Sequence, residues 1–174
     1  MTSMTSASVF SIHELAARGL VRELQNELDS GVDVDRRTAI YKKTPLIRAA
    51  ECAQLDSMVL LLDHKADANA IDVRGWTAMH CCCARMSGRV QRGIRLLLDR
   101  KANINQRTDV FDNTELHLAA ENLNFDAVQF LIECKANINI KNANGDTAMD
   151  LVPPSMKPLF LPVLSAPPVP LPKL

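Results

Sequence analysis

The stretch Thr114-Glu115-Leu116-His117-Leu118-Ala119-Ala120 sets the pattern for most of this chain. Its first residue belongs to a series of threonines, Thr44, Thr77, Thr114 and Thr147, that are separated by 33, 37 and 33 residues. An apolar run such as Phe130-Leu131-Ile132 follows later in each of the full periods, and a Lys-Ala-Asp or Lys-Ala-Asn segment recurs at residues 65, 101 and 135. The threonines, the apolar runs and the Lys-Ala segments recur in the same order and at nearly the same spacing, which indicates an internal repeat.

Each period predicts a pair of helices that is followed by a turn. A threonine caps a helix because its oxygen accepts an orphan amide hydrogen of the first turn. Pro45 suits that turn, where its missing donor costs nothing. The Asp- and Asn-rich segment after each second helix favours turns. One such unit cannot bury its own apolar faces, so we expect the units to stack into a continuous core.

These blocks resemble ankyrin repeats, whose signature runs Gly-x-Thr-Pro-Leu-His-x-Ala-Ala. Gly75-Trp76-Thr77-Ala78-Met79-His80 is close to it, and so is the stretch from Thr114. The resemblance implies an all-α ankyrin-repeat solenoid of helix-turn-helix units and short β-hairpin loops, with four repeats plus a partial fifth. We expect residues 1–10 to be a disordered N-terminus, 11–152 an ankyrin-repeat domain and 153–174 a Pro-rich C-terminal tail.

The phase divides the domain into five units. They span residues 11–37, 38–71, 72–108, 109–141 and 142–152, and the first is a capping repeat. The third unit carries three extra residues within 86–91, which we interpret as tolerated loop drift or as a partner contact. Lys42 and Asp112 stand where the family has a glycine with positive φ, so the loop of the second unit is expected to be irregular.

Composition limits the classes of function. Lys plus Arg and Asp plus Glu both number 20 in 174 residues, so neither nucleic acid nor a membrane surface is favoured as a partner. The cysteines are odd in number, and three are contiguous: Cys52, Cys81, Cys82, Cys83 and Cys134. We interpret them as reduced thiols of a protein in the cytoplasm or the nucleus. The sequence shows neither a secretion signal nor a membrane span.

The sequence offers no catalytic motif. His80 and the three cysteines after it suggest a metal cluster, but consecutive helical residues point about 100° apart and cannot converge on one ion. Cys82 and Cys83 replace alanines, which favours core packing over a redox-sensitive thiol, and Cys52 is the more exposed candidate thiol. His80 and His117 match the motif histidine, which implies a brace between helix and hairpin. We expect no enzyme, no cofactor and no metal.

The resemblance implies that a partner protein lies on the concave face, which is made of hairpin tips and the exposed side of the first helices. The only Trp and the only Tyr of the chain fall on this face, and both residue types are enriched at interaction hot spots. The alternative for Trp76 is packing on its neighbouring hairpin. The candidate contacts are Ile40, Tyr41, Lys43, Glu51, Cys52, Val73, Arg74, Trp76, Arg85, Val110, Phe111, Asn113, Glu121 and Asn122.

We expect a monomeric adaptor or scaffold whose partner is another protein. The alternatives are an inhibitor of an enzyme such as a kinase, and a structural spacer that docks through its Pro-rich tail. Residues 165–174 are typical of polyproline II, whereas the apolar residues 156–164 are expected to cover the end of the last repeat.

Overall fold

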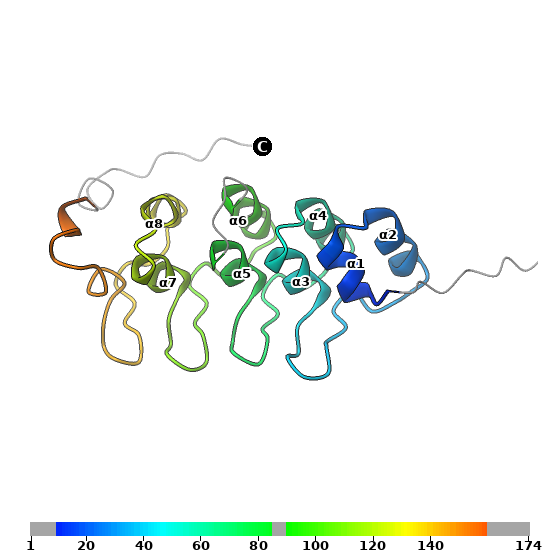
Figure 1. The fold of residues 1–174 in the computed structure, drawn as a ribbon, viewed down its shortest axis with the longest axis horizontal. Coiled ribbons are helices and arrows are strands. Elements are labelled where there is room, and N and C mark those ends of the chain that lie inside the picture. Colours follow the sequence, from blue (N-terminus) through cyan, green and yellow to red (C-terminus); the bar gives the residue numbers. More distant parts are fainter. Residues whose placement is uncertain (1–9, 85–89, 160–174) are drawn as a thin grey trace, which may run out of the picture.

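The computed structural model describes residues 10–84 and 90–159. Within them the chain forms four pairs of short helices joined by long loops (Figure 1). The helices are α1 (Ile12–Arg18), α2 (Val21–Asp29), α3 (Pro45–Glu51), α4 (Leu55–Asp63), α5 (Ala78–Ala84), α6 (Val90–Asp99), α7 (Glu115–Glu121) and α8 (Phe125–Glu133).

The helix pairs stack into two layers. The first helices pack in the order α1, α3, α5 and α7, and α2, α4 and α6 pack in the same order in the second layer. The loops between pairs all project from the first-helix layer, on the side away from the second helices (Figure 1). The predicted all-α ankyrin-type solenoid is therefore confirmed.

Two of the threonines cap helices as predicted. Thr44 is the N-cap of α3, and its side chain accepts a hydrogen bond of 3.3 Å from the amide of Ile47. Pro45 occupies the first turn of the same helix. Thr114 and His117 form a capping box at the start of α7. In the first unit Ser11 takes the capping role for α1, which ends at Gly19 with φ of 72°.

The core runs the length of the described array. Its large members, among them Leu46, Met58, Leu61, Leu116 and Leu131, are fully buried between neighbouring pairs. Burial of each such side chain contributes about 1.5–3 kcal/mol. The alanine pairs of α3 and α7 are also buried, and their small side chains let the first helices approach closely.

The loops close through backbone hydrogen bonds. Thr108 N–H donates to the carbonyl of Asn113 at 2.9 Å, and Asp72 N–H donates to that of Trp76 at 2.9 Å. In the described part of the chain, the only β-bridge outside helices joins Lys141 and Thr147. The expected β-hairpins are thus hydrogen-bonded loops without strands.

The glycine replacements keep the backbone conformation that glycine adopts in the other loops. The φ angles of Lys42 and Asp112 are 53° and 52°, compared with 73° for Gly75 and 85° for Gly145. The expected irregularity of the second loop is wrong in this respect. Lys42 adopts the left-handed conformation. This conformation is unfavourable for lysine because its Cβ comes too close to the following carbonyl oxygen, a clash that glycine avoids.

The two ends of the array differ from the predicted boundaries. Phe10 belongs to the folded part, because the guanidinium of Arg18 lies 4.2 Å from its ring centroid. The fifth unit has its loop, but residues 148–150 form a turn instead of a helix. Ala148 and Val152 are buried there, and Met156 packs against the core. The predictions for residues 1–9 and 160–174 lie outside the described residues.

We expect Lys42→Gly to raise the free energy of unfolding by about 0.5–1 kcal/mol, because glycine reaches positive φ without a Cβ clash. The urea midpoint of the variant measures this change. Gly75→Ala is the matched opposite change and should lower the midpoint, since its Cβ would lie 2.5 Å from the amide nitrogen of Asp109. A lower midpoint for Lys42→Gly would contradict this interpretation of the loop.

Candidate functional site

Backbone hydrogen bonds hold the loop tips in a row. Val73 N–H donates to the carbonyl of Tyr41 at 3.1 Å, Asp109 N–H to that of Arg74 at 3.1 Å and Ala143 N–H to that of Phe111 at 2.9 Å. Each of these loops is therefore tied to the next by one backbone bond, whose acceptor lies three residues before the capping threonine in every case. The tips form a continuous ridge with a set spacing.

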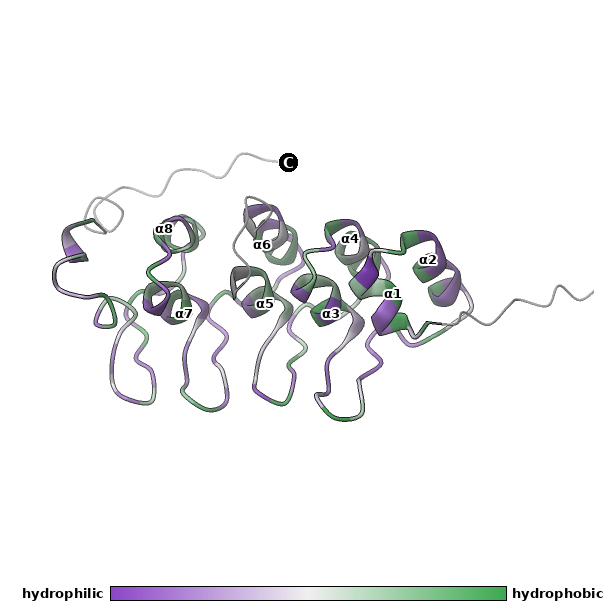
Figure 2. Ribbon diagram, viewed as in Figure 1, coloured by the Kyte–Doolittle hydropathy of each residue, from purple (hydrophilic) through white to green (hydrophobic). Residues whose placement is uncertain are grey.

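The ridge carries exposed apolar side chains on its second, third and fourth loops. Figure 2 shows green segments at the loop tips, and five large apolar side chains there are well exposed. They are Ile40 (76% exposed), Tyr41 (58%), Val73 (49%), Val110 (67%) and Phe111 (59%). Large exposed apolar side chains that gather on one edge of a protein are typical of an interaction site.

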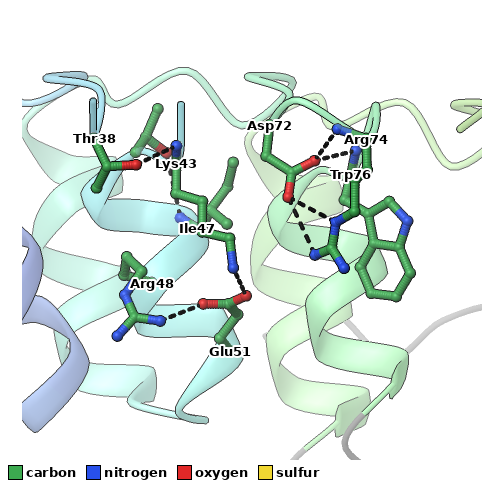
Figure 3. A network of polar contacts seen from close by, with 9 residues as sticks. Thr38, Lys43, Ile47, Arg48, Glu51, Asp72, Arg74 and Trp76 are labelled. Atoms are coloured by element: carbon green, nitrogen blue, oxygen red, sulfur yellow. Dashed lines mark hydrogen bonds and ion pairs between the residues drawn. The ribbon is translucent and has the colours of Figure 1, made fainter. Parts of the chain in front are cut away.

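In the second unit the charges beside the ridge are paired with one another (Figure 3). The Lys43 ammonium donates to the carboxylate of Glu51, and the Arg48 guanidinium donates to it at 2.6 Å. Lys43 Nζ also lies 5.5 Å from the ring centroid of Tyr41. Burial raises the pKa of Glu51, but the hydrogen bonds and charges of Lys43 and Arg48 outweigh it and lower the pKa overall.

The third unit places Trp76 by a different network (Figure 3). The buried carboxylate of Asp72 accepts from the backbone amides of Arg74 at 2.8 Å and Trp76 at 3.0 Å. The same carboxylate accepts a hydrogen bond of 3.2 Å from the Arg74 guanidinium. That guanidinium lies 4.5 Å from the centroid of the Trp76 ring. Trp76 is half-buried and packs against the core.

A groove of about 400 Å³ lies between the third, fourth and fifth loops and α7. Six candidate contacts meet there: Arg74, Trp76, Val110, Phe111, Asn113 and Glu121. The other lining residues are Thr108, Leu118, Asn142, Asn144 and Leu151. We call this set of residues the Trp76–Phe111 groove.

One candidate was wrongly placed on the surface. Asn113 is 8% exposed, and its amide oxygen accepts from the side-chain amide of Asn142 at 3.0 Å. It joins the fourth loop to the fifth, so it forms the floor of the groove and is not an exposed contact.

The remaining candidates lie apart from the groove. Lys43 and Glu51 pair within the second unit, and Cys52 is partly exposed at the end of α3. Asn122 is exposed at the end of α7, where its side chain donates to a backbone carbonyl. Arg85 and most of the extra residues of the third unit, 86–91, lie outside the described residues.

Sequence reasoning missed the groove residues that the fifth unit supplies, Asn142, Asn144 and Leu151. The phase set by Thr147 contained the signal, because Asn142 lies as far before that threonine as Asp72 lies before Thr77. Asn142 also repeats the role of Asp72, since its side-chain oxygen accepts from two amides of its own loop at 3.0 Å.

The motif histidines brace the array. Nδ1 of His117 accepts from the amide of Thr114 at 3.2 Å, and its Nε2 lies 3.1 Å from the carbonyl oxygen of Asp146 in the next loop. The first bond leaves the ring proton on Nε2, which therefore donates to that carbonyl. His80 repeats the first bond with Thr77 at 3.2 Å.

His80 faces a buried carboxylate across the unit boundary. Its Nε2 lies 3.9 Å from an oxygen of Glu115, which stands at the start of α7. Burial lowers the pKa of His80 to about 4, and the charge of Asp72 offsets this only in part. The ring is therefore neutral near pH 7.

The cysteines of α5 pack as core residues. Cys81 and Cys82 are buried, as predicted for Cys82, whereas nothing is described of the Cys83 side chain. Burial raises the pKa of the Cys82 thiol to about 12, and it also raises that of Cys81. A thiol in that range is not a nucleophile near neutral pH. Within residues 10–84 and 90–159, no cluster of His, Cys, Asp and Glu is arranged to hold a metal ion.

Comparison with known families identifies this architecture. A family model described as ankyrin repeats (3 copies) matches residues 12–108 and 84–151. The chain belongs to the ankyrin-repeat family. Ankyrin repeats generally mediate protein–protein interaction and are generally not enzymes.

Curated relatives share the repeats at low identity. A putative ankyrin repeat protein of Rickettsia felis is 29% identical over 127 residues, which cover 72% of this chain and 41% of the relative. Human ankyrin repeat and SOCS box protein 16 is 28% identical over 134 residues, 77% of this chain and 28% of the relative. Mouse palmitoyltransferase ZDHHC13 is 23% identical over 177 residues, which cover 83% of this chain and 28% of the relative. The chain thus spans less than half the length of these relatives.

The helices of this ankyrin array are short. In the part of the chain that the structure describes, no helix has the length and apolar character needed to cross a membrane.

We expect the ankyrin array to lose about 2 kcal/mol of stability between pH 7 and pH 5 through His80. Its pKa is about 4 in the folded state, compared with 6.5 for an unperturbed histidine, so the unfolded chain binds more protons in this window. Stability is full above pH 6.5 and falls as the pH drops toward 4. His13 and His117, whose pKa values burial also lowers, add to the same trend.

Urea unfolding of the wild type and of His80→Gln at both pH values measures the effect. The variant should show a smaller difference between pH 7 and pH 5, whatever its stability at pH 7. Glu51 does not confound the comparison. Because its pKa is lowered from the ordinary value of 4.5, it changes the stability only at pH values below that range. An unchanged difference would show that His80 does not control this pH dependence.

Proposed function

We propose that the chain is an adaptor or scaffold that binds a partner protein along the loop ridge and in the Trp76–Phe111 groove. The observation that supports the proposal is that the loop ridge and the Trp76–Phe111 groove share residues. The exposed side chains of Val110 and Phe111 belong to the ridge and also line the groove. A partner that covered the ridge would therefore place its own side chains in the groove.

The chemistry of this face suits a protein partner. Interface cores are enriched in aromatic residues and Arg, and they are depleted in unpaired charge. Tyr41, Trp76 and Phe111 supply the aromatic rings, and Arg74 is already paired with Asp72. The array holds these side chains on rigid loops, so little conformational entropy is lost on binding.

We expect Tyr41→Ala combined with Phe111→Ala to weaken partner binding at least thirtyfold, about 2 kcal/mol, because both rings are exposed anchors of the ridge. Stability should change by less than about 0.5 kcal/mol, since neither ring is part of the core. Quantitative affinity purification with mass spectrometry, followed by titration of the purified partner, measures the loss.

The matched control is Val59→Ala combined with Leu159→Ala. These side chains are 40% and 60% exposed, and neither lies on the ridge or in the groove. The control should retain the same partners. Equal binding by both double variants and the wild type would remove the proposal.

The tail offers a second test. We expect deletion of residues 160–174 to leave partner binding unchanged within about twofold, because the ridge and the groove consist of residues before this segment. Binding that disappears with the tail and survives the ridge variant would favour a structural spacer that docks through its prolines.

A further inference from the structure

The second and fourth units are the same length between loop tip and first helix, so their residues can be compared one to one. Counted from the capping residues Thr44 and Thr114, Tyr41 corresponds to Phe111 and Glu51 to Glu121. Each unit thus has an aromatic ring at its loop tip and a carboxylate at the end of its first helix.

In the second unit a cation joins these two groups. Lys43 forms an ion pair with Glu51, and the same ammonium lies 5.5 Å from the ring centroid of Tyr41. In the third unit the cation comes before the aromatic residue along the chain. Arg74 is at the loop tip, and its guanidinium lies 4.5 Å from the ring centroid of Trp76. A cation on an aromatic ring is therefore a repeated feature of this surface.

The fourth unit keeps the ring and the carboxylate but has no cation at the positions that correspond to Lys43 and Arg48. Asn113 stands in place of Lys43, and Leu118 stands in place of Arg48. Among the ion pairs and cation–ring contacts of the described residues, none involves Glu121 or Phe111.

The neighbouring groups leave this position open to a cation from outside. Asn113 is held by Asn142, and Arg107 pairs with Asp112 at 3.5 Å. The charge of Arg74 is matched by Asp72. Among the described residues, Glu121 is thus the exposed, unpaired charge of the groove, and the one other charged residue that lines it, Arg74, is paired with Asp72.

We propose that the Trp76–Phe111 groove takes a lysine or arginine side chain of the partner protein. Its aliphatic stem packs against Phe111, and its charged end pairs with Glu121 and completes the arrangement that Lys43 makes within the second unit. Asn144, on the fifth loop, offers an amide to the partner backbone. This inference rests on the proposed function, because it specifies which partner segment the same groove accepts.

The energies favour this occupant over an acidic or a purely apolar one. A cation on an aromatic face contributes about 0.5–1 kcal/mol at an exposed site, and an exposed ion pair contributes about 0.2–1 kcal/mol. An acidic side chain would instead meet the unpaired carboxylate of Glu121, and like charges repel. A purely apolar side chain would cover that carboxylate without pairing it.

The test uses a display library of random short peptides selected on the purified full-length chain. We expect the selected peptides to share a Lys or Arg at one position. Glu121→Gln should weaken their binding about fivefold, and Glu23→Gln, the same change on the exposed surface of α2, should leave it unchanged. Because Glu121 is exposed, its variant is not expected to unfold the array.

A double-mutant cycle gives the sharper test. Replacing the selected Lys by norleucine, or the selected Arg by an uncharged isostere such as citrulline, should weaken binding to the wild type about fivefold and should have little effect on binding to Glu121→Gln. Asn113→Lys places the cation of the second unit in the fourth, so the folded variant should lose the basic peptides. If that variant does not fold, the Glu121 cycle decides alone.

The outcomes separate this inference from the proposed function. Selected peptides that need Phe111 but show no basic residue, or no coupling to Glu121, overturn the inference and leave the ridge as a binding surface. Peptides that are indifferent to Phe111→Ala as well as to Glu121→Gln overturn both. A selection without any enriched sequence counts against the inference.

Discussion

The contact between neighbouring first helices is the interaction on which the rest of the structure depends. A helix of seven residues, such as α3 or α7, has no stability of its own in water. It persists because small residues such as Ala49 and Ala120 let the next helix approach and bury the large side chains around it. The loops inherit this spacing, and one backbone hydrogen bond at each boundary between the second and fifth loops joins their tips in a row.

The surface that results is regular in its backbone and varied in its charges. In the second, third and fourth units the loop places an aromatic ring on this surface, and in the second and third a cation of the same unit lies near that ring. The fourth unit has the ring without such a cation. A solenoid makes this difference meaningful, because each unit presents equivalent positions to the same face and a single substitution changes only the local chemistry.

Much of the fold was predictable from particular residues. The spacing of the capping threonines predicted the helix pairs, and Pro45, Thr114 and His117 take the local roles expected of them. Part of the candidate site was predictable in the same way, because Arg74, Trp76 and Phe111 were placed by phase on the face that carries the groove. Burial was less predictable. Asn113 occupies the position of Lys43 but turns inward, since Asn142 of the next loop offers its side chain a partner.

The sequence by itself determined which residues begin helices, which face the core and which lie at loop tips, because these properties repeat with the period and arise within one unit. Only the tertiary structure decided which side chains meet across unit boundaries. Trp76, Phe111 and Leu151 come from three different units, and the groove that they share exists because stacking brings those units side by side. Contacts of that kind depend on the distance between stacked layers, which a one-dimensional pattern does not specify.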